Sequence, residues 1–334
     1  MATIQDVAQR AGVSRSTVSY ALSGKRSISP DTRRRIEDAI KELGFTVNAG
    51  ARALATAQTM TLGLLSQFHQ DEFAPAMLQY IRSVSDASRE LGYDVLFVND
   101  TDGPSAVRRI TASNQVDGVV LLDVTHNDPR VSSLREATQP SALIGLPADR
   151  EGLDVFDLDF GESARVLVDH LCGLGHTEIV LISPPEHVFE RGGSYGWRFR
   201  DAAIERAARH GVSIHAYHGE SQQPAITHNV NAILDARPTA TALMVHNDAT
   251  VAALPLILQQ RGVSVPHDLS VVGLYSKDFG RTFSLDYTAI ESSPDKLGQL
   301  AVQQVVRRIL DAGQAGPPVV KFIAPELVDR GSTR

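Results

Sequence analysis

The chain has 334 residues, and about one domain per 150 residues predicts roughly two domains. Apolar residues make up 43% and charged residues 21%, which supports hydrophobic cores and excludes a disordered chain. The single cysteine, Cys172, excludes an internal disulfide and fits a reducing cytoplasm. The opening residues MATIQDVAQRAGVS lack the apolar core of a secretory signal, and no stretch of about 18 apolar residues predicts a membrane span.

Charge is distributed unevenly along the chain. The formal net charge is -7, yet residues 1–60 contain nine basic and five acidic residues, a local charge of +4. The rest of the chain carries 23 basic and 34 acidic residues, a charge of -11. A basic segment attached to an acidic body indicates that the segment contacts a polyanion and that the body does not.

The basic segment predicts three short helices with clear starts and stops. The residues that cap, open or end them are Thr3, Asp6, Gly12, Ser14, Ser29, Pro30 and Gly44. Two helices joined by a glycine-containing turn and closed by a third form a helix-turn-helix module. A three-helix bundle of another function is the alternative, and the basic excess favours DNA binding.

The motifs T-I-x-D-V-A, A-G-V-S-x-x-T-V-S and T-R-x-x-I stand close together in this segment. With them, the segment resembles the DNA-binding head of the LacI/GalR family of bacterial transcription regulators, and family motifs continue through the rest of the chain. The resemblance implies a homodimer that binds a pseudo-palindromic operator, with the second helix of each head in the DNA major groove.

The second helix supplies most of the predicted DNA contacts. Three of its residues are expected to face base edges: Arg15, Ser16 and Tyr20. Four residues in or after it are expected to contact phosphates: Thr17, Ser19, Lys25 and Arg26. Residues 33–35 are three consecutive arginines. Two interpretations of this run remain open, a phosphate contact and a solvated helix face.

The segment FTVNAGARALATAQ, residues 45–58, favours helix but is too short to be stable alone. By resemblance it is a hinge helix that forms on operator DNA and enters the minor groove. Leu54 then inserts into the central base step and bends the duplex, and Asn48 and Arg52 complete the predicted contacts. An ordinary linker leucine is the alternative for Leu54.

From Met60 onward, short apolar runs alternate with helical stretches, which predicts parallel sheets covered on both faces. The predicted strands are Thr61–Leu65, Asp94–Val98, Gly118–Leu122, Ala142–Gly145, Ile179–Ser183, Ser213–Tyr217, Ala242–Val245 and Ser270–Leu274. The resemblance implies a two-lobed, periplasmic-binding-protein-like core. The expected units are a head (1–46), a hinge (47–59) and a core (60–334), with lobe 1 at about 60–158 and 288–316 and lobe 2 at about 161–286 and 320–334.

Ligands of such sheets bind beyond the carboxyl ends of the strands, which here face the cleft between the lobes. The effector-binding residues predicted for this cleft are Ala76, Met77, Arg191, Tyr195, Asn247, Asp248 and Tyr275. Tyr195 stands where the family often has an arginine, and Tyr275 where it has an aspartate. Arginine and aspartate are both good hydrogen-bonding partners for vicinal hydroxyls. The absence of both residues at these positions weakens the prediction that the effector is a simple sugar.

Other classes of protein fit the sequence less well. It has no G-x-S-x-G, no P-loop and no G-x-G-x-x-G after a strand, so no enzyme, catalytic residue, cofactor or metal site is predicted. The prediction is a cytoplasmic, nucleoid-associated, dimeric repressor controlled by a small-molecule effector. A DNA-binding regulator without an effector, and a cytoplasmic sugar-binding protein, are the alternatives.

Overall fold

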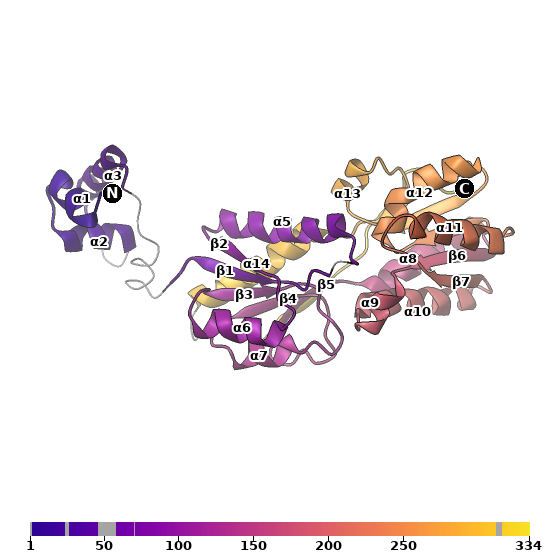
Figure 1. Ribbon diagram of the computed structural model, residues 1–334, viewed down its shortest axis with the longest axis horizontal. Helices are drawn as coiled ribbons and strands as arrows, with labels where there is room; N and C mark the ends of the chain where they lie inside the picture. Colours follow the sequence, from indigo (N-terminus) through magenta and orange to yellow (C-terminus); the bar gives the residue numbers. More distant parts are fainter. Residues whose placement is uncertain (1, 24–26, 46–57, 70, 312–315) are drawn as a thin grey trace.

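The computed structural model describes residues 2–23, 27–45, 58–69, 71–311 and 316–334 (Figure 1). Five of the predicted DNA contacts lie outside these ranges: Lys25, Arg26, Asn48, Arg52 and Leu54. Within the described ranges, every helix is too short or too polar to cross a membrane.

The head consists of three helices that pack around a small apolar core: α1 (Ile4–Ala11), α2 (Arg15–Ser23) and α3 (Pro30–Leu43). Thr3 and Asp6 form a capping box at the start of α1, as predicted. Gly12, at φ 66°, ends α1 in the left-handed conformation that glycine adopts without strain. Val7, Val18 and Ile36 bury their side chains where the three helices meet.

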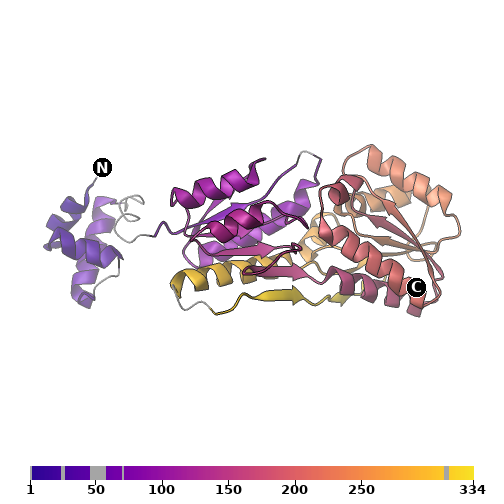
Figure 2. The same ribbon diagram turned by 90° about the horizontal axis from the view of Figure 1, so that it is seen from below.

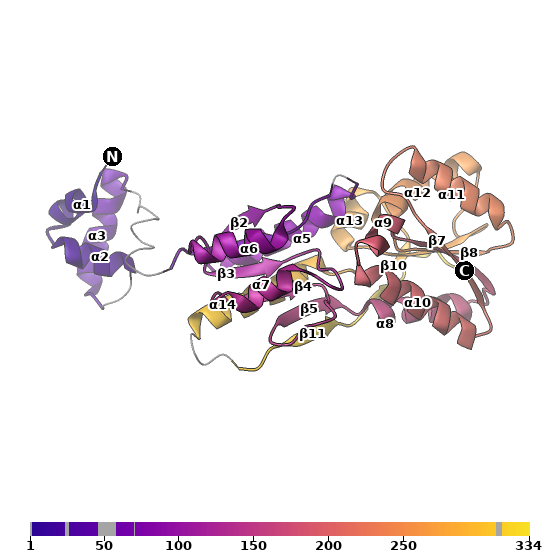
Figure 3. The ribbon, with the colours of Figure 1, turned by 60° about the horizontal axis from the view of Figure 1, so that its bottom comes forward.

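Lobe 1 is built on a six-stranded sheet in the order β11-β5-β4-β3-β1-β2, parallel throughout. Its strands are β1 (Thr61–Leu65), β2 (Asp94–Val98), β3 (Gly118–Leu121), β4 (Ser141–Ile144), β5 (Asp154–Leu158) and β11 (Val320–Ile323). Its helices are α5 (Ala74–Glu90), α6 (Gly103–Ala112), α7 (Arg130–Glu136) and α14 (Pro294–Leu310). Helices α5 and α14 cover one face of the sheet, and α6 and α7 cover the other (Figure 3).

Lobe 2 is built on a second sheet in the order β12-β10-β9-β8-β6-β7, in which only β12 is antiparallel to its neighbour. Its strands are β6 (Glu178–Ser183), β7 (Ser213–His218), β8 (Ala242–Val245), β9 (Ser270–Leu274), β10 (Thr288–Ile290) and β12 (Leu327–Val328). Its helices are α8 (Phe160–Gly173), α9 (Glu186–Glu190), α10 (Ser194–Arg209), α11 (Ala225–Ala236), α12 (Asp248–Arg261) and α13 (Lys277–Thr282). Along β6, Ile179 and Leu181 pack on the face of α8 and α10, whereas Val180 and Ile182 pack on the face of α11 and α12.

The eight predicted strands are confirmed, each with ends within one residue, but the assignment of the last segments to the lobes is wrong at two points. Strand β10 pairs with β9 and so belongs to lobe 2, although lobe 1 was expected to resume at residue 288. Strand β11 pairs with β5 at the edge of lobe 1 before the chain returns to lobe 2 (Figure 2). Neither β10 nor β11 was among the predicted strands, and the local sequence does not show which sheet such a short segment joins.

Candidate functional site

Helix α2 presents the three predicted base-contacting residues on its exposed side: Arg15, Ser16 and Tyr20. Thr17 and Ser19 are half-buried beside them. The Ser14 hydroxyl accepts a hydrogen bond from the Thr17 backbone N–H at 3.1 Å and lies 2.8 Å from the hydroxyls of both Ser16 and Thr17. Ser14 therefore caps α2 as predicted and orients two neighbouring hydroxyl groups.

The arginines of the head differ in the ion pairs and hydrogen bonds that they form. No residue in the described ranges forms an ion pair with Arg15. By contrast, Arg34 pairs with Asp31 at 3.1 Å, and Arg35 donates a hydrogen bond to the Ala11 carbonyl at 3.2 Å. The Arg15 guanidinium is thus available to DNA, whereas the bond of Arg35 to α1 favours a structural role for that residue.

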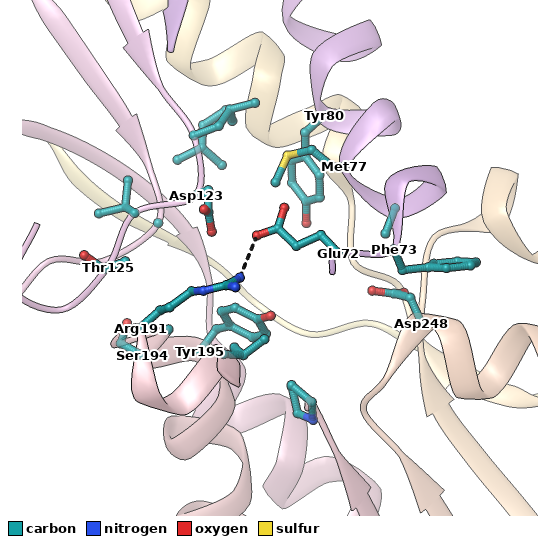
Figure 4. A pocket seen from close by; sticks show the side chains of 18 of the residues that line it. Glu72, Phe73, Met77, Tyr80, Asp123, Thr125, Arg191, Ser194, Tyr195 and Asp248 are labelled. Atoms are coloured by element: carbon teal, nitrogen blue, oxygen red, sulfur yellow. Dashed lines mark ion pairs between the residues drawn. The ribbon is translucent and has the colours of Figure 1, made fainter. Parts of the chain in front are cut away.

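A cavity of about 490 Å³ lies between the two lobes, at the carboxyl ends of strands from both sheets (Figure 4). Six of the seven predicted effector-binding residues line it: Ala76, Met77, Arg191, Tyr195, Asn247 and Asp248. Asn247 also caps helix α12, since its side-chain oxygen accepts the Thr250 backbone N–H at 2.8 Å. This cap places the neighbouring Asp248 in the first turn of α12, at the cavity wall.

Tyr275 is the predicted cavity residue that the structure places elsewhere. Leu274 and Ser276 line the cavity, and because side chains alternate along an extended strand, Tyr275 points to the opposite side. Its ring is 1% exposed, and its hydroxyl donates to the Tyr287 carbonyl at 2.5 Å. Tyr275 belongs to the core of lobe 2.

Arg191 connects the two lobes across the cavity. It follows α9 in lobe 2 and pairs with Asp71 of lobe 1, while its Nη1 lies 3.8 Å from Oε1 of Glu72 (Figure 4). The hydrogen bond from Arg191 lowers the pKa of the Asp71 carboxyl. The Ser194 hydroxyl adds a second bridge by donating to the Leu146 carbonyl at 3.0 Å.

A second arginine, Arg198, was not predicted as a cavity residue. It pairs with the buried Asp157 of β5, and its guanidinium lies 5.3 Å from the centroid of the Phe160 ring. Burial raises the pKa of Asp157 to about 6 in spite of this partner. Arg198 stands three residues after Tyr195 in α10, and this helical spacing places both residues on one face. The same spacing in the sequence could have predicted Arg198 as a cavity residue.

Three further carboxylates face the cavity: Glu72, Asp123 and Asp248. Burial raises the pKa of Glu72 to about 7, with a smaller contribution from the charge of Asp123. Burial also raises the pKa of Asp248 to about 7, and it raises that of Asp123. One side-chain ligand atom from each of His69, Glu72 and Asp123 lies within 4.8 Å of the other two, close enough to share a cation.

Aromatic rings form the lobe 2 side of the cavity. The ring of Phe160 lies 5.5 Å from that of Tyr195 and 5.6 Å from that of His246, measured between centroids. Burial, and then the charge of Arg198, lower the pKa of His246 to about 3, so this imidazole is neutral. Apolar rings with a few converging polar groups are typical of a small-molecule binding site.

A helix-turn-helix head on a two-lobed core with a cavity between the lobes defines a ligand-responsive DNA-binding regulator. Residues 3–48 match the bacterial regulatory proteins of the lacI family, and residues 168–333 match the periplasmic binding protein-like domain. The chain belongs to the LacI family of transcriptional regulators.

Relatives match this chain over nearly its whole length. It is 26% identical to the HTH-type transcriptional repressor PurR of Actinobacillus pleuropneumoniae serotype 3 (strain JL03), covering 100% of this chain and 99% of the relative. It is 28% identical to the HTH-type transcriptional regulator CelR of Thermobifida fusca, covering 99% and 98%. Both relatives are named as transcriptional regulators.

Two solved structures share the architecture. The complex of the transcriptional regulator CelR with cellobiose superimposes with a TM-score of 0.69 at 25% identity, covering 99% of this chain and 100% of the other. The lac repressor dimer bound to operator and the anti-inducer ONPF superimposes with a TM-score of 0.81 at 23% identity, covering 99% of both chains. The predicted fold class, a helical head on a two-lobed α/β core, is confirmed.

Proposed function

We propose that the protein is a repressor that binds a pseudo-palindromic operator as a homodimer, and that a small molecule in the cavity controls its DNA affinity. The observation that carries this proposal is the position of the cavity: it lies between the lobes, and its wall comes from both. A ligand that contacts both lobes stabilises one angle between them. It thereby shifts the population in which the two heads are spaced for successive major grooves.

The roles of individual residues follow from the same mechanism. Arg15 reads a base edge, with Ser16 and Tyr20 beside it, while Thr17 and Ser19 position the head on phosphates. We assign the further DNA contacts to Lys25, Arg26, Asn48, Arg52 and Leu54 on the sequence alone, with Leu54 as the residue that bends the operator. The protein acts in the cytoplasm, on the nucleoid, and catalyses no reaction.

A selection from genomic DNA tests the function. The purified full-length protein is bound to a fragment library at fixed salt, and the retained fragments are sequenced. The proposal predicts a pseudo-palindromic motif that Arg15→Ala relaxes at one base position. Arg34→Ala is the matched control and leaves the motif unchanged, because Arg34 lies on α3 and a phosphate contact there would carry no sequence information. Recovery of no motif, with and without added metabolites, would contradict the proposal.

A further inference from the structure

The wall of the cavity carries an excess of negative charge. Its described lining residues include four carboxylates and two guanidinium groups: Glu72, Asp123, Asp157 and Asp248, and Arg191 and Arg198. No lysine is among the described residues that line it. Arg198 is neutralised by Asp157, and Arg191 is neutralised by Asp71, which lies outside the lining. Three carboxylates of the wall therefore lack a full ion-pair partner.

These three carboxylates are also poorly hydrogen-bonded. Glu72 accepts a long hydrogen bond from the backbone N–H of His69 at 3.4 Å, and Arg191 approaches it no closer than 3.8 Å. Within the described ranges, no group donates a hydrogen bond to the side chains of Asp123 or Asp248: Arg130 donates to the Asp123 backbone carbonyl, and the Thr250 N–H donates to Asn247. Glu72, Asp123 and Asp248 are half-buried, and an ionised carboxylate in such a partly desolvated site is unfavourable until a cation compensates it. A positively charged ligand therefore gains more here than a neutral one.

The three carboxylates face the cavity from both lobes. Glu72 and Asp123 belong to lobe 1 and lie near each other on that side of the Tyr195 hydroxyl, whereas Asp248 belongs to lobe 2 and lies apart from them (Figure 4). The charges of all three contribute to raising the pKa of this phenol, which places them within electrostatic reach of it. Aromatic faces attract cations as well, and the nearby Phe160 ring already holds Arg198 in this way.

The spacing of the groups sets the size of the cation. Because the ligand atoms of His69, Glu72 and Asp123 lie within 4.8 Å of one another, a single nitrogen with hydrogen bonds of about 2.8 Å can contact all three. Asp248 lies outside this trio, on the other lobe. A lone metal ion on the trio would leave Asp248 uncompensated, whereas an extended molecule reaches both sites.

We propose that the effector is a small organic amine. Its protonated nitrogen lies among His69, Glu72 and Asp123, and a second hydrogen-bond donor of the same molecule contacts Asp248. This inference rests on the proposed function, in which the cavity is the effector site. It assigns the chemical class of the effector, and amino polyols and polyamines both belong to that class.

Matched pairs of compounds test the proposal on the full-length protein. D-glucamine is compared with D-sorbitol, and putrescine with 1,4-butanediol. In each pair the neutral compound has hydroxyl groups where the other has amino groups. Thermal-shift and calorimetric titrations are run at about pH 8, where both amines are protonated. At least one amine is expected to raise Tm and to bind about tenfold or more tightly than its neutral counterpart.

Two aspartate variants locate the amine, and a third is the control. Asp123→Asn and Asp248→Asn are each expected to weaken amine binding about tenfold and to leave the neutral compound unaffected. The backbone of residue 123 has φ 50°, a left-handed conformation that asparagine tolerates as aspartate does, so the substitution does not strain the chain. Asp286→Asn changes an exposed aspartate of lobe 2 and serves as the matched control, with no expected change. The Tm of each variant without ligand verifies that it folds.

Three results would overturn the inference: equal binding of amine and neutral partner, no rise in Tm with either amine, or tight binding of Mn²⁺ or Zn²⁺ alone that His69→Ala abolishes. The operator assay separates this inference from the proposed function. An amine that binds without changing operator affinity refutes the effector role of the cavity. A neutral polyol that does change operator affinity supports that role and refutes the amine.

Discussion

The substitution Asp248→Asn is expected to stabilise the ligand-free protein. Burial raises the pKa of this carboxyl from 3.8 to about 7, and each tenfold change in acidity corresponds to about 1.4 kcal/mol. The full shift would cost at most about 4 kcal/mol of folding free energy. Because water enters the cavity beside the side chain, and because Asp248 lies at the positive end of α12, we expect a net gain of about 2 kcal/mol from the substitution.

The sign of this effect depends on pH. Between about pH 4 and pH 7 the unfolded chain releases the Asp248 proton, while the folded chain keeps it. The penalty in the wild type therefore grows over this range and reaches its full value above pH 7. The Tm of Asp248→Asn should exceed that of the wild type at about pH 8, and the difference should shrink steadily toward pH 4.

The measurement is a thermal-shift series across this pH range, with Asp286→Asn as the exposed control of the same residue type. An equal or lower Tm for Asp248→Asn above pH 7 would refute the reasoning. So would a Tm difference that does not change with pH, because it would show that the effect is not the titration of this carboxyl.

Four further substitutions test other parts of the structure. Arg15→Ala should cost about 1–3 kcal/mol of operator binding in anisotropy titrations and relax one base position, and unchanged specificity would remove Arg15 from base readout. Leu54→Ala should reduce operator bending, measured by energy transfer between the DNA ends, more than non-specific binding, and equal bending by both proteins would exclude the wedge. Tyr275→Phe should lower the free energy of unfolding by about 1 kcal/mol with ligand affinity unchanged, whereas weaker ligand binding would contradict its place in the core. Arg308→Ala leaves the Asp154 carboxylate buried and unpaired, so chemical denaturation should show a loss of about 3–5 kcal/mol, and a loss below about 1 kcal/mol would contradict the importance of this pair.

The helices and strands could be predicted because their apolar spacing is a local property of the sequence. In the head, Gly12 and Gly44 mark helix ends that the structure confirms with left-handed conformations. In the core, four-residue apolar runs bounded by helices predicted strands such as Ala242–Val245. The same local patterns say nothing of partners, and so residues 320–323, which form β11 of lobe 1, were assigned to lobe 2.

The chemistry of the cavity could be predicted only in part. Asp248 follows a strand at a position that the family resemblance marks, and it does line the cavity. Glu72 and Asp123 stand in connecting segments without periodicity, and they meet only because the folded chain brings two distant loops together. Tyr275 was placed in the cavity because of the family resemblance. The alternation of side chains along the chain after β9 points it away from the cavity and into the core.

The central claim, that the cavity and the head are coupled, is tested most directly by reciprocal binding measurements. Operator affinity is measured with and without the cavity ligand that raises Tm most, and the affinity for that ligand is measured with and without operator. Thermodynamic linkage predicts that both affinities change by the same factor, about 5- to 150-fold. Operator affinity that stays the same at saturating ligand would contradict the claim.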